Sequence, residues 1–170
     1  TRETFSTGSV HLHPDGKQLL FTGQSYTTKR KHKTGAYVCD LKTGKTRELL
    51  KPRTYDLYDA LWWGEKILLL GTDGKRYGLN ENVQFYTLDP ATGEVALLAP
   101  YEDALGSSVG SDCRLGGGQE WLVEDGKLYF TATIRNASQV FCLEESGDIR
   151  PVYTQEGSVD CLDAQGDTLC

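Results

Sequence analysis

The sequence predicts an all-β fold: a partial β-propeller of about three four-stranded antiparallel blades, followed by the start of a fourth. The main observation is a repeat, in which short apolar strands separated by glycine turns recur three times. The equivalent turn glycines, Gly44, Gly93 and Gly147, lie 49 and 54 positions apart, close to the length of one blade. A second observation is that helical periodicity is nowhere sustained. Repeated strands without helices favour stacked blades over other all-β folds.

The first blade is expected at about residues 8–51. A hairpin turn is predicted at Asp15-Gly16, because Gly accepts a positive φ and Asp tolerates it. In the strand that follows, Leu19 and Phe21 alternate with Gln18, Leu20 and Thr22, which indicates a half-buried strand. Two further strands, around 37–41 and 48–50, complete this blade.

The second blade is expected at about residues 57–99. The uniformly apolar run Ile67–Leu70 indicates a strand that is buried on both faces, as a ring of stacked sheets requires. Trp62 and Trp63 must point to opposite faces of their strand. One is expected in the core, and the other either between blades or exposed. A polar loop at residues 71–82 separates the inner strands from the outer ones.

The third blade is expected at about residues 119–154, after an insertion at Tyr101–Gly118 that ends in three glycines. Residues 158–163 and 167–170 are interpreted as the first two strands of a partial fourth blade. We therefore expect residues 1–170 to be a single propeller fragment of a longer protein. Its open blade edges would allow self-association.

Cysteine usage favours a reducing, cytoplasmic location. Cys39 and Cys142 occupy the repeat position that holds Leu88 in the second blade, so we interpret them as small apolar core residues. The chain has five cysteines, with no Cys-x-x-Cys and no metal-ligand spacing. No apolar run is long enough to cross a bilayer, so no membrane partner is expected.

The charge is distributed unevenly. Residues 1–54 contain 11 Lys and Arg against 4 Asp and Glu, whereas residues 55–170 contain 7 against 20. The basic excess is concentrated in Lys29–Lys33, in a predicted loop of the first blade. Because no stacking aromatic or known nucleic-acid module surrounds this run, we interpret it as a solvated loop and expect no nucleic-acid partner. A propeller that associates with nucleic acid through residues 29–33 is kept as a further possibility.

Two motifs suggest catalysis, and neither is in a context that supports it. Residues 106–110 satisfy Gly-x-Ser-x-Gly, but a nucleophile elbow needs a buried strand before it, a helix after it and a His downstream of Ser108. The only histidines, His11, His13 and His32, all lie upstream. Residues 71–76 resemble a phosphate loop but lack its spacing. We expect no catalytic residue in this chain.

His11 and His13 lie on one face of a predicted strand and could share a metal ion. No third ligand is evident in the sequence near them. They are interpreted as polar residues at a strand end, and neither a metal nor a cofactor is expected.

The turn at residues 13–17, followed by the strand at 19–22, is similar to the Ser-Pro-Asp-Gly-Lys strand opening of TolB-like propellers, with His13 in place of Ser. Together with the turns at 40–45 and 89–94 and the loops at 71–78 and 110–118, it resembles the N-terminal propeller of prolyl oligopeptidase family serine peptidases. Acylaminoacyl-peptidases and dipeptidyl-peptidase-like members are the most similar.

This resemblance implies a function. In that family the propeller restricts access of peptides to an α/β-hydrolase domain, which carries the catalytic residues and is expected downstream of this chain. The segment alone would hydrolyse nothing, and the complete protein would be a serine peptidase. Long loops on a repeat scaffold tend to carry binding, so Arg114, Arg76 and Tyr77 are the predicted substrate-binding residues. The alternative is a non-enzymatic TolB-like or WD-type propeller that binds other proteins.

Overall fold

The computed structural model describes residues 3–29, 31–109, 118–166 and 168–170. The chain divides into two compact units, Thr1–Leu97 and Leu98–Cys170, and each is described by itself. The regular elements of the described residues are all strands, apart from one short 3₁₀ turn, η1 (Gly78–Asn80). Within this part of the chain, no helix has the length and apolar character needed to span a membrane.

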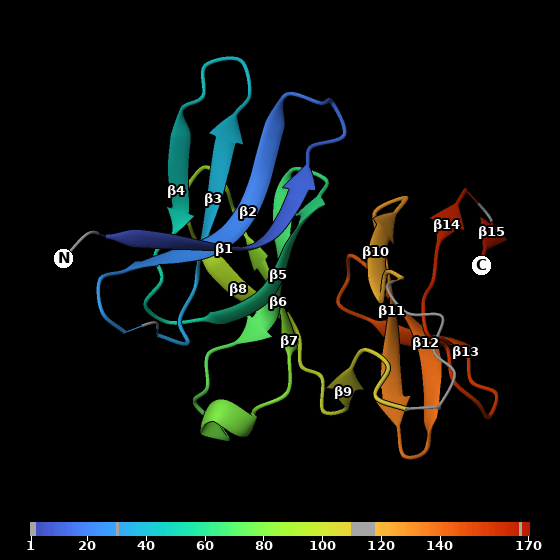
Figure 1. Cartoon of the computed structure of the whole chain (residues 1–170). Coiled ribbons are helices and arrows are strands. Elements are labelled where there is room, and N and C mark those ends of the chain that lie inside the picture. Colours follow the sequence, from blue (N-terminus) through green and yellow to red (C-terminus); the bar gives the residue numbers. More distant parts are fainter. Residues whose placement is uncertain (1–2, 30, 110–117, 167) are drawn as a thin grey trace. The chain divides into compact units, whose positions relative to one another are not determined.

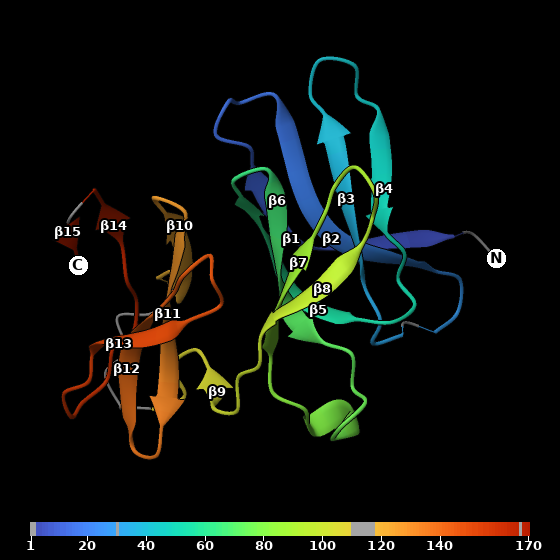
Figure 2. The ribbon, with the colours of Figure 1, turned by 180° about the vertical axis from the view of Figure 1, so that it is seen from behind.

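Unit 1 contains two four-stranded antiparallel sheets in which strands that follow one another in sequence are also neighbours (Figures 1 and 2). The first has the order β1-β2-β3-β4, and the second has the order β5-β6-β7-β8. This is the meander of a propeller blade, so the predicted fold class, a partial propeller, is confirmed. The strands are β1 (Thr4–Leu12), β2 (Gln18–Tyr26), β3 (Gly35–Asp40), β4 (Thr46–Leu50), β5 (Asp56–Trp63), β6 (Lys66–Thr72), β7 (Gln84–Leu88) and β8 (Val95–Ala99).

One hydrophobic cluster joins the two sheets of unit 1. It combines Leu20, Ala36 and Val38 of the first sheet with Ile67, Leu69 and other apolar residues of the second. All four residues of Ile67–Leu70 are fully buried, which confirms that β6 is covered on both faces. Burial at this level is the main stabilising contribution to such a sheet pair.

β2 is half-buried as predicted, but its most buried positions are not the alternating residues Leu19 and Phe21. Leu20 is buried in the cluster between the two sheets and Thr22 is also buried, whereas Leu19 and Phe21 are only partly buried on the opposite face. Phe21 stacks on Tyr37, with ring centroids 5.4 Å apart, and Phe5 packs edge-on against both rings. Apolar residues on both faces made the alternation ambiguous.

Trp62 and Trp63 point to opposite faces, as predicted. Trp63 is only 3% exposed and belongs to the buried core. Trp62 packs against the cluster between the sheets, and its indole N–H donates a hydrogen bond to the His11 carbonyl at 3.4 Å. Trp62 therefore has the inter-blade position rather than the exposed one.

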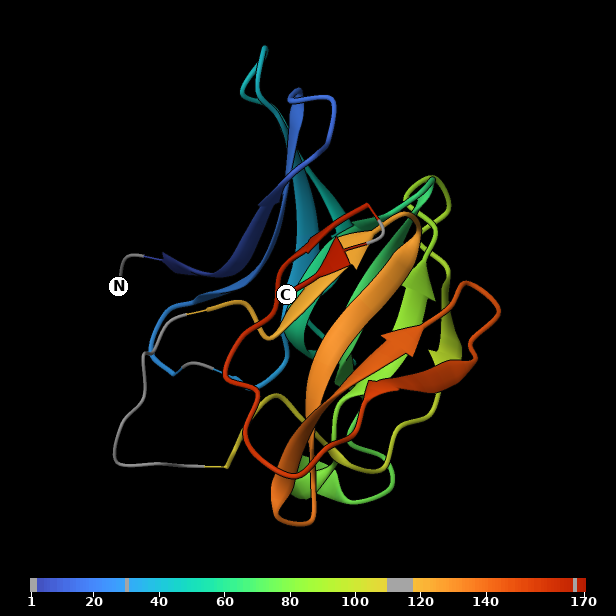
Figure 3. The same ribbon diagram turned by 90° about the vertical axis from the view of Figure 1, so that its right-hand side faces the viewer.

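Unit 2 contains a sheet in the order β10-β11-β12-β13, with β9 also paired to β11, and a small hairpin of β14 and β15 (Figure 3). Residues 158–163, predicted as a strand, form none. The hairpin instead turns at Gly166, and its first strand begins at Ala164. The strands are β9 (Ala104–Leu105), β10 (Trp121–Glu124), β11 (Lys127–Ile134), β12 (Ala137–Leu143), β13 (Ile149–Tyr153), β14 (Ala164–Gln165) and β15 (Thr168–Leu169).

The cysteines at the shared repeat position differ in burial. Cys142 is fully buried, as predicted, and burial raises the pKa of its thiol. Cys39 is only half-buried, because it pairs with Leu19 on the face of the first sheet that lies away from the core cluster. The interpretation as a core residue is therefore confirmed for Cys142 alone. The turn glycines do share one conformation, with φ of 69° at Gly44, 75° at Gly93 and 91° at Gly147.

The first strand of each sheet is interrupted at the same point relative to its partner. In β1 one extra residue lies between the pairs Thr7↔Gly23 and Val10↔Phe21, and in β5 one lies between Leu57↔Gly71 and Asp59↔Leu70. Bulges of this kind bend a strand and redirect its side chains.

In unit 2 the corresponding interruption is a long one. β9 pairs Leu105 with Ala132, and pairing resumes where the Glu120 carbonyl accepts a hydrogen bond from the Thr131 N–H at 2.7 Å. β9 and β10 are therefore two pieces of one inner strand, and residues 106–119 are inserted between them. The sequence analysis placed this insertion before the blade, because the two-residue β9 has too short a pattern to be recognised.

Candidate functional site

The chain topology of unit 1 brings three connections to one end of its sheets. Because the strands are antiparallel, the β2–β3 connection (27–34) and the β6–β7 connection (73–83) emerge where β1 and β5 begin. The Thr34 N–H donates to the Tyr55 carbonyl at 2.9 Å, and the Lys33 ammonium donates to the Asp73 carbonyl at 3.0 Å. These bonds join both loops to each other and to the connection between β4 and β5.

A pocket of about 380 Å³ lies at this end, beside the bulges of β1 and β5. Its lining includes Gly8, Gln24, His32, Asp56 and Tyr58. The Tyr58 side chain is 60% exposed. The pocket therefore has a mostly polar lining that includes one exposed aromatic side chain, a combination suited to a small polar ligand.

Buried polar side chains hold the wall of this pocket in place. The Gln24 amide forms two hydrogen bonds with the backbone of Lys31, donating to its carbonyl at 2.6 Å and accepting from its N–H at 3.0 Å. The Thr34 hydroxyl accepts from the Leu57 N–H at 2.6 Å. Since these groups are already paired, they fix the loop shape and leave recognition to the more exposed residues.

The β6–β7 loop is organised by one carboxylate that the sequence analysis did not identify. Glu81 accepts hydrogen bonds from the Thr72 hydroxyl at 2.6 Å, the Arg76 N–H at 2.7 Å and the Tyr77 N–H at 3.0 Å. The hydrogen bond from Thr72 is the largest of the causes that lower the pKa of Glu81. An acidic residue nine positions after the end of a strand carries no recognised sequence signal, so this role is visible only in the structure.

An ion pair lies near the start of the same loop. The Lys75 ammonium is 2.7 Å from an Asp73 carboxylate oxygen. Burial works to raise the pKa of Asp73, but hydrogen bonds from Lys75 and the positive charges of Lys75 and Lys33 outweigh it and lower the pKa. The loop is therefore held at both ends by charged groups.

Two predicted substrate-binding residues, Arg76 and Tyr77, lie on this loop. The Arg76 guanidinium is 4.7 Å from the centroid of the Tyr77 ring, within the range of a cation–π interaction. Tyr77 is 56% exposed, and Leu79, in η1, is 77% exposed. The loop thus presents a cation, an aromatic ring and an apolar side chain together. The third predicted residue, Arg114, lies outside the described residues.

The other sequence candidates have structural partners. The Ser108 hydroxyl donates to the Thr133 hydroxyl at 3.0 Å, in a segment that follows the two-residue β9 and is neither strand nor helix. His11 lies 2.8 Å from the Asp59 carboxylate, and His13 lies edge-on to Trp62, with ring centroids 4.5 Å apart. Among the residues that the structure describes, no three His, Cys, Asp or Glu side chains are close enough to hold a metal ion.

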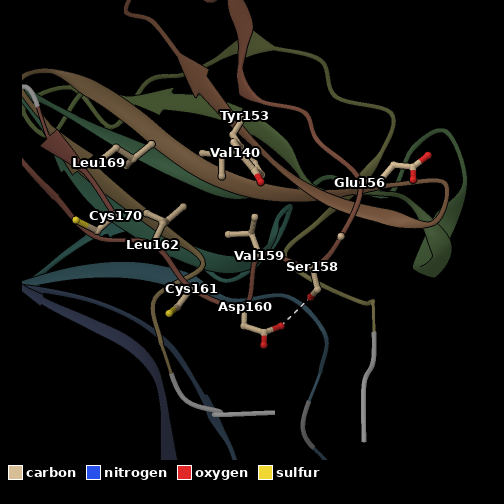
Figure 4. A pocket seen from close by; sticks show the side chains of 11 residues that line it. Val140, Tyr153, Glu156, Ser158, Val159, Asp160, Cys161, Leu162, Leu169 and Cys170 are labelled. Atoms are coloured by element: carbon tan, nitrogen blue, oxygen red, sulfur yellow. Dashed lines mark hydrogen bonds between the residues drawn. The ribbon is translucent and has the colours of Figure 1, made fainter. Parts of the chain in front are cut away.

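Unit 2 has a pocket of its own, about 430 Å³ in volume (Figure 4). Val140 of β12 and Tyr153 of β13 form one side, and Leu162 and Leu169 contribute further apolar surface. Its polar groups include Ser158, whose hydroxyl donates to Asp160 at 2.8 Å. Its lining is mostly apolar, and no cationic side chain contributes to it among the described residues, so it is a weaker candidate than the loops of unit 1.

No family model matches the chain, and neither does any curated protein. Solved structures do match it. A puromycin hydrolase is similar to this chain over 95% of its length, with a TM-score of 0.66 and 18% identity. An acylaminoacyl peptidase from Pyrococcus horikoshii is similar over 92% of this chain, with a TM-score of 0.63 and 21% identity. An oligogalacturonate lyase from Vibrio parahaemolyticus also matches, with a TM-score of 0.52 and 12% identity over 89% of this chain.

These similarities establish the fold. The chain spans 24% of the puromycin hydrolase, 22% of the acylaminoacyl peptidase and 47% of the lyase. The resemblance to the propeller of prolyl oligopeptidase family peptidases, predicted from the turn motifs, is confirmed as a likeness of fold. The lyase has a different activity in its name, which illustrates that one fold supports several functions.

Proposed function

We propose that this chain is the propeller segment of a serine peptidase of the prolyl oligopeptidase type, where it gates access and helps to bind the peptide. The observation that carries the proposal is the likeness over nearly the whole chain to puromycin hydrolase and acylaminoacyl peptidase. A catalytic α/β-hydrolase domain, which would supply the nucleophile, is proposed to follow in the same protein. The segment itself contributes recognition and no chemistry.

The loops of unit 1 are the proposed peptide contacts. Tyr58 in the pocket lining and Tyr77 on the β6–β7 loop provide exposed aromatic surface. The Arg76 guanidinium can donate hydrogen bonds to a peptide carboxylate or carbonyl. Arg114 remains a proposed contact from the sequence. Because these residues act on binding, their loss should affect KM more than kcat.

The direct test uses the complete gene product that contains this chain, beside the 170-residue segment. A serine-directed fluorophosphonate probe should label the complete protein and leave the segment unlabelled. Puromycin and a Z-Gly-Gly-Phe anilide are suitable first substrates. One structural neighbour is a puromycin hydrolase, and another is an acylaminoacyl peptidase in complex with Z-Gly-Gly-Phe-chloromethyl ketone. Absence of both labelling and hydrolysis in the complete protein would overturn the proposal.

The binding role is tested in the same enzyme. The Arg76→Ala, Tyr77→Ala and Arg114→Ala variants should raise KM several-fold while kcat changes by less than about twofold. Lys42→Ala, an exposed substitution in the β3–β4 turn, is the matched control and should leave both constants unchanged. An unchanged KM in all three loop variants would remove these residues from the binding site.

The alternative is a non-enzymatic propeller that binds other proteins, and the lyase match is a reminder that likeness of fold does not decide between them. The fluorophosphonate experiment separates the two. A cytoplasmic location and self-association through blade edges also stay predictions, as does the arrangement of residues 1–170 as one propeller fragment. Free thiols at Cys39, Cys142, Cys161 and Cys170 support the cytoplasmic location.

A further inference from the structure

A second pocket of unit 1, about 650 Å³ in volume, has a strongly basic lining. Five cations contribute to it: Lys29, Lys31 and Lys33 from the β2–β3 loop, and Lys51 and Arg53 from the connection between β4 and β5. Two acids, Glu3 and Glu48, also line it, so positive charge exceeds negative charge by three. Residues that are far apart in the sequence thus converge on one concave surface with a net positive charge.

Part of this charge is held in place before any ligand arrives. The Lys33 ammonium donates to the Asp73 carbonyl, which fixes one cation at the side of the pocket. The backbone at Lys31 is held by the amide of Gln24, whose side chain is buried with 3% exposure. Because a buried polar side chain already holds the basic loop in place, ordering this loop adds less entropy cost when a ligand binds.

Most of the remaining charge is uncompensated within the part of the chain that the structure describes. Lys29, Lys31, Lys51 and Arg53 are exposed, and their side chains form no ion pair with a described residue. Like charges gathered in one concavity repel one another and raise the local concentration of anions. A multivalent anion would relieve this repulsion at several side chains together.

The residue types indicate the kind of anion. Four of the five cations are lysines, whose ammonium groups act as point charges and suit phosphate oxygens, whereas paired carboxylate recognition favours the planar fork of arginine. Tyr26 is the single aromatic residue in the lining, so there is no platform on which successive bases could stack. The pocket volume lies in the range of small-molecule sites.

We propose that this pocket binds a small multivalent phosphate anion of the inorganic oligophosphate class. The proposal is independent of the peptidase function, because it concerns other residues and a different ligand. Sodium tripolyphosphate is the probe. Isothermal titration of the 170-residue chain should give saturable binding with one site per chain, which weakens as added salt screens the lysines.

Two charge-matched double variants test the location. Lys31→Ala with Lys51→Ala removes two pocket cations and should weaken tripolyphosphate binding at least about tenfold, since each charge-assisted hydrogen bond contributes strongly. Lys42→Ala with Lys45→Ala removes two exposed lysines of the β3–β4 turn and should change the affinity less than about twofold. Thermal melting of both variants without ligand verifies that each is folded.

Three outcomes would overturn the proposal. Absence of saturable binding would exclude the site, and equal weakening in both double variants would indicate attraction to net charge alone. Tighter binding of a thymidine oligonucleotide than of tripolyphosphate would assign the surface to nucleic acid instead. Failure of the fluorophosphonate experiment on the complete protein would leave all three readouts unaffected.

Discussion

Glu81 is predicted to be the residue that keeps the β6–β7 loop in its binding shape. Its carboxylate accepts three hydrogen bonds, from Thr72, Arg76 and Tyr77, at 2.6 to 3.0 Å. A hydrogen bond to a charged group is worth about 1.5–3 kcal/mol where solvent is excluded, and less on a partly exposed loop. We therefore assign about 2 kcal/mol to the three bonds together, which corresponds to roughly a 30-fold change in the opening equilibrium of the loop.

Native-state hydrogen exchange measures this directly, because two of the donors are backbone amides. In Glu81→Ala the amides of Arg76 and Tyr77 should exchange about 30-fold faster, while the Leu69 amide in β6 keeps its protection. Glu94→Ala, at an exposed position in the β7–β8 turn, is the matched control and should leave both amides unchanged. Unchanged exchange at Arg76 and Tyr77 would refute the assigned role of Glu81.

The pH dependence has a defined sign. The pKa of Glu81 is lowered from its ordinary value of 4.5, mainly by the Thr72 hydroxyl, so the carboxylate is favoured in the folded loop. The contribution of Glu81 to loop stability is fully present above about pH 4.5 and is lost as the pH falls through the folded-state pKa. Amide chemical shifts of Arg76 and Tyr77 should move together in that acidic range. Titration of these amides near neutral pH instead would contradict the assignment.

Two further predictions concern the core. Leu69→Ala, in the cluster between the two sheets, should lower the free energy of unfolding by about 2–5 kcal/mol. Leu79→Ala, at an exposed position, is the control and should change that free energy by less than about 0.5 kcal/mol, as measured by denaturant titration. Cys142, whose burial raises the pKa of its thiol, should react with N-ethylmaleimide only when the protein unfolds, whereas the exposed Cys161 should react in the native protein. Peptide mapping by mass spectrometry measures both, and modification of Cys142 in the native protein would contradict the prediction.

The repeat predicted the fold class because its signals are local. Turn glycines need a positive φ, and a strand such as Ile67–Leu70 can be recognised from its uninterrupted apolar run. The inward face of β2 could not be predicted in the same way. Both of its faces carry apolar residues, and the choice of Leu20 over Phe21 depends on packing against the second sheet.

The binding role of Arg76 and Tyr77 stays a prediction. Both residues were chosen from loop length and residue type, and the structure places them side by side on an exposed loop. Glu81 and Tyr58 were missed, because the role of each depends on tertiary geometry: a carboxylate folding back onto two amides, and a ring placed beside a strand bulge. The basic pocket was recognised only as the run Lys29–Lys33, since Lys51 and Arg53 join it through the fold.

The inner strands indicate how this fold admits functional loops without losing its blades. In each of the three blade sheets the extra residues enter just after the position of Gly23, Gly71 or Ala132 on the partner strand. The insertion is one residue in the first two sheets and residues 106–119 in the third. A Cβ at Gly23 or Gly71 would meet a neighbouring backbone oxygen at 2.8 or 2.6 Å, so the backbones there approach closely. Because pairing resumes on the far side in all three sheets, the hydrogen-bond register of the outer strands does not depend on the length of the insertion. An inner-strand bulge is therefore a position where a propeller blade can gain a binding loop at little cost to its sheet.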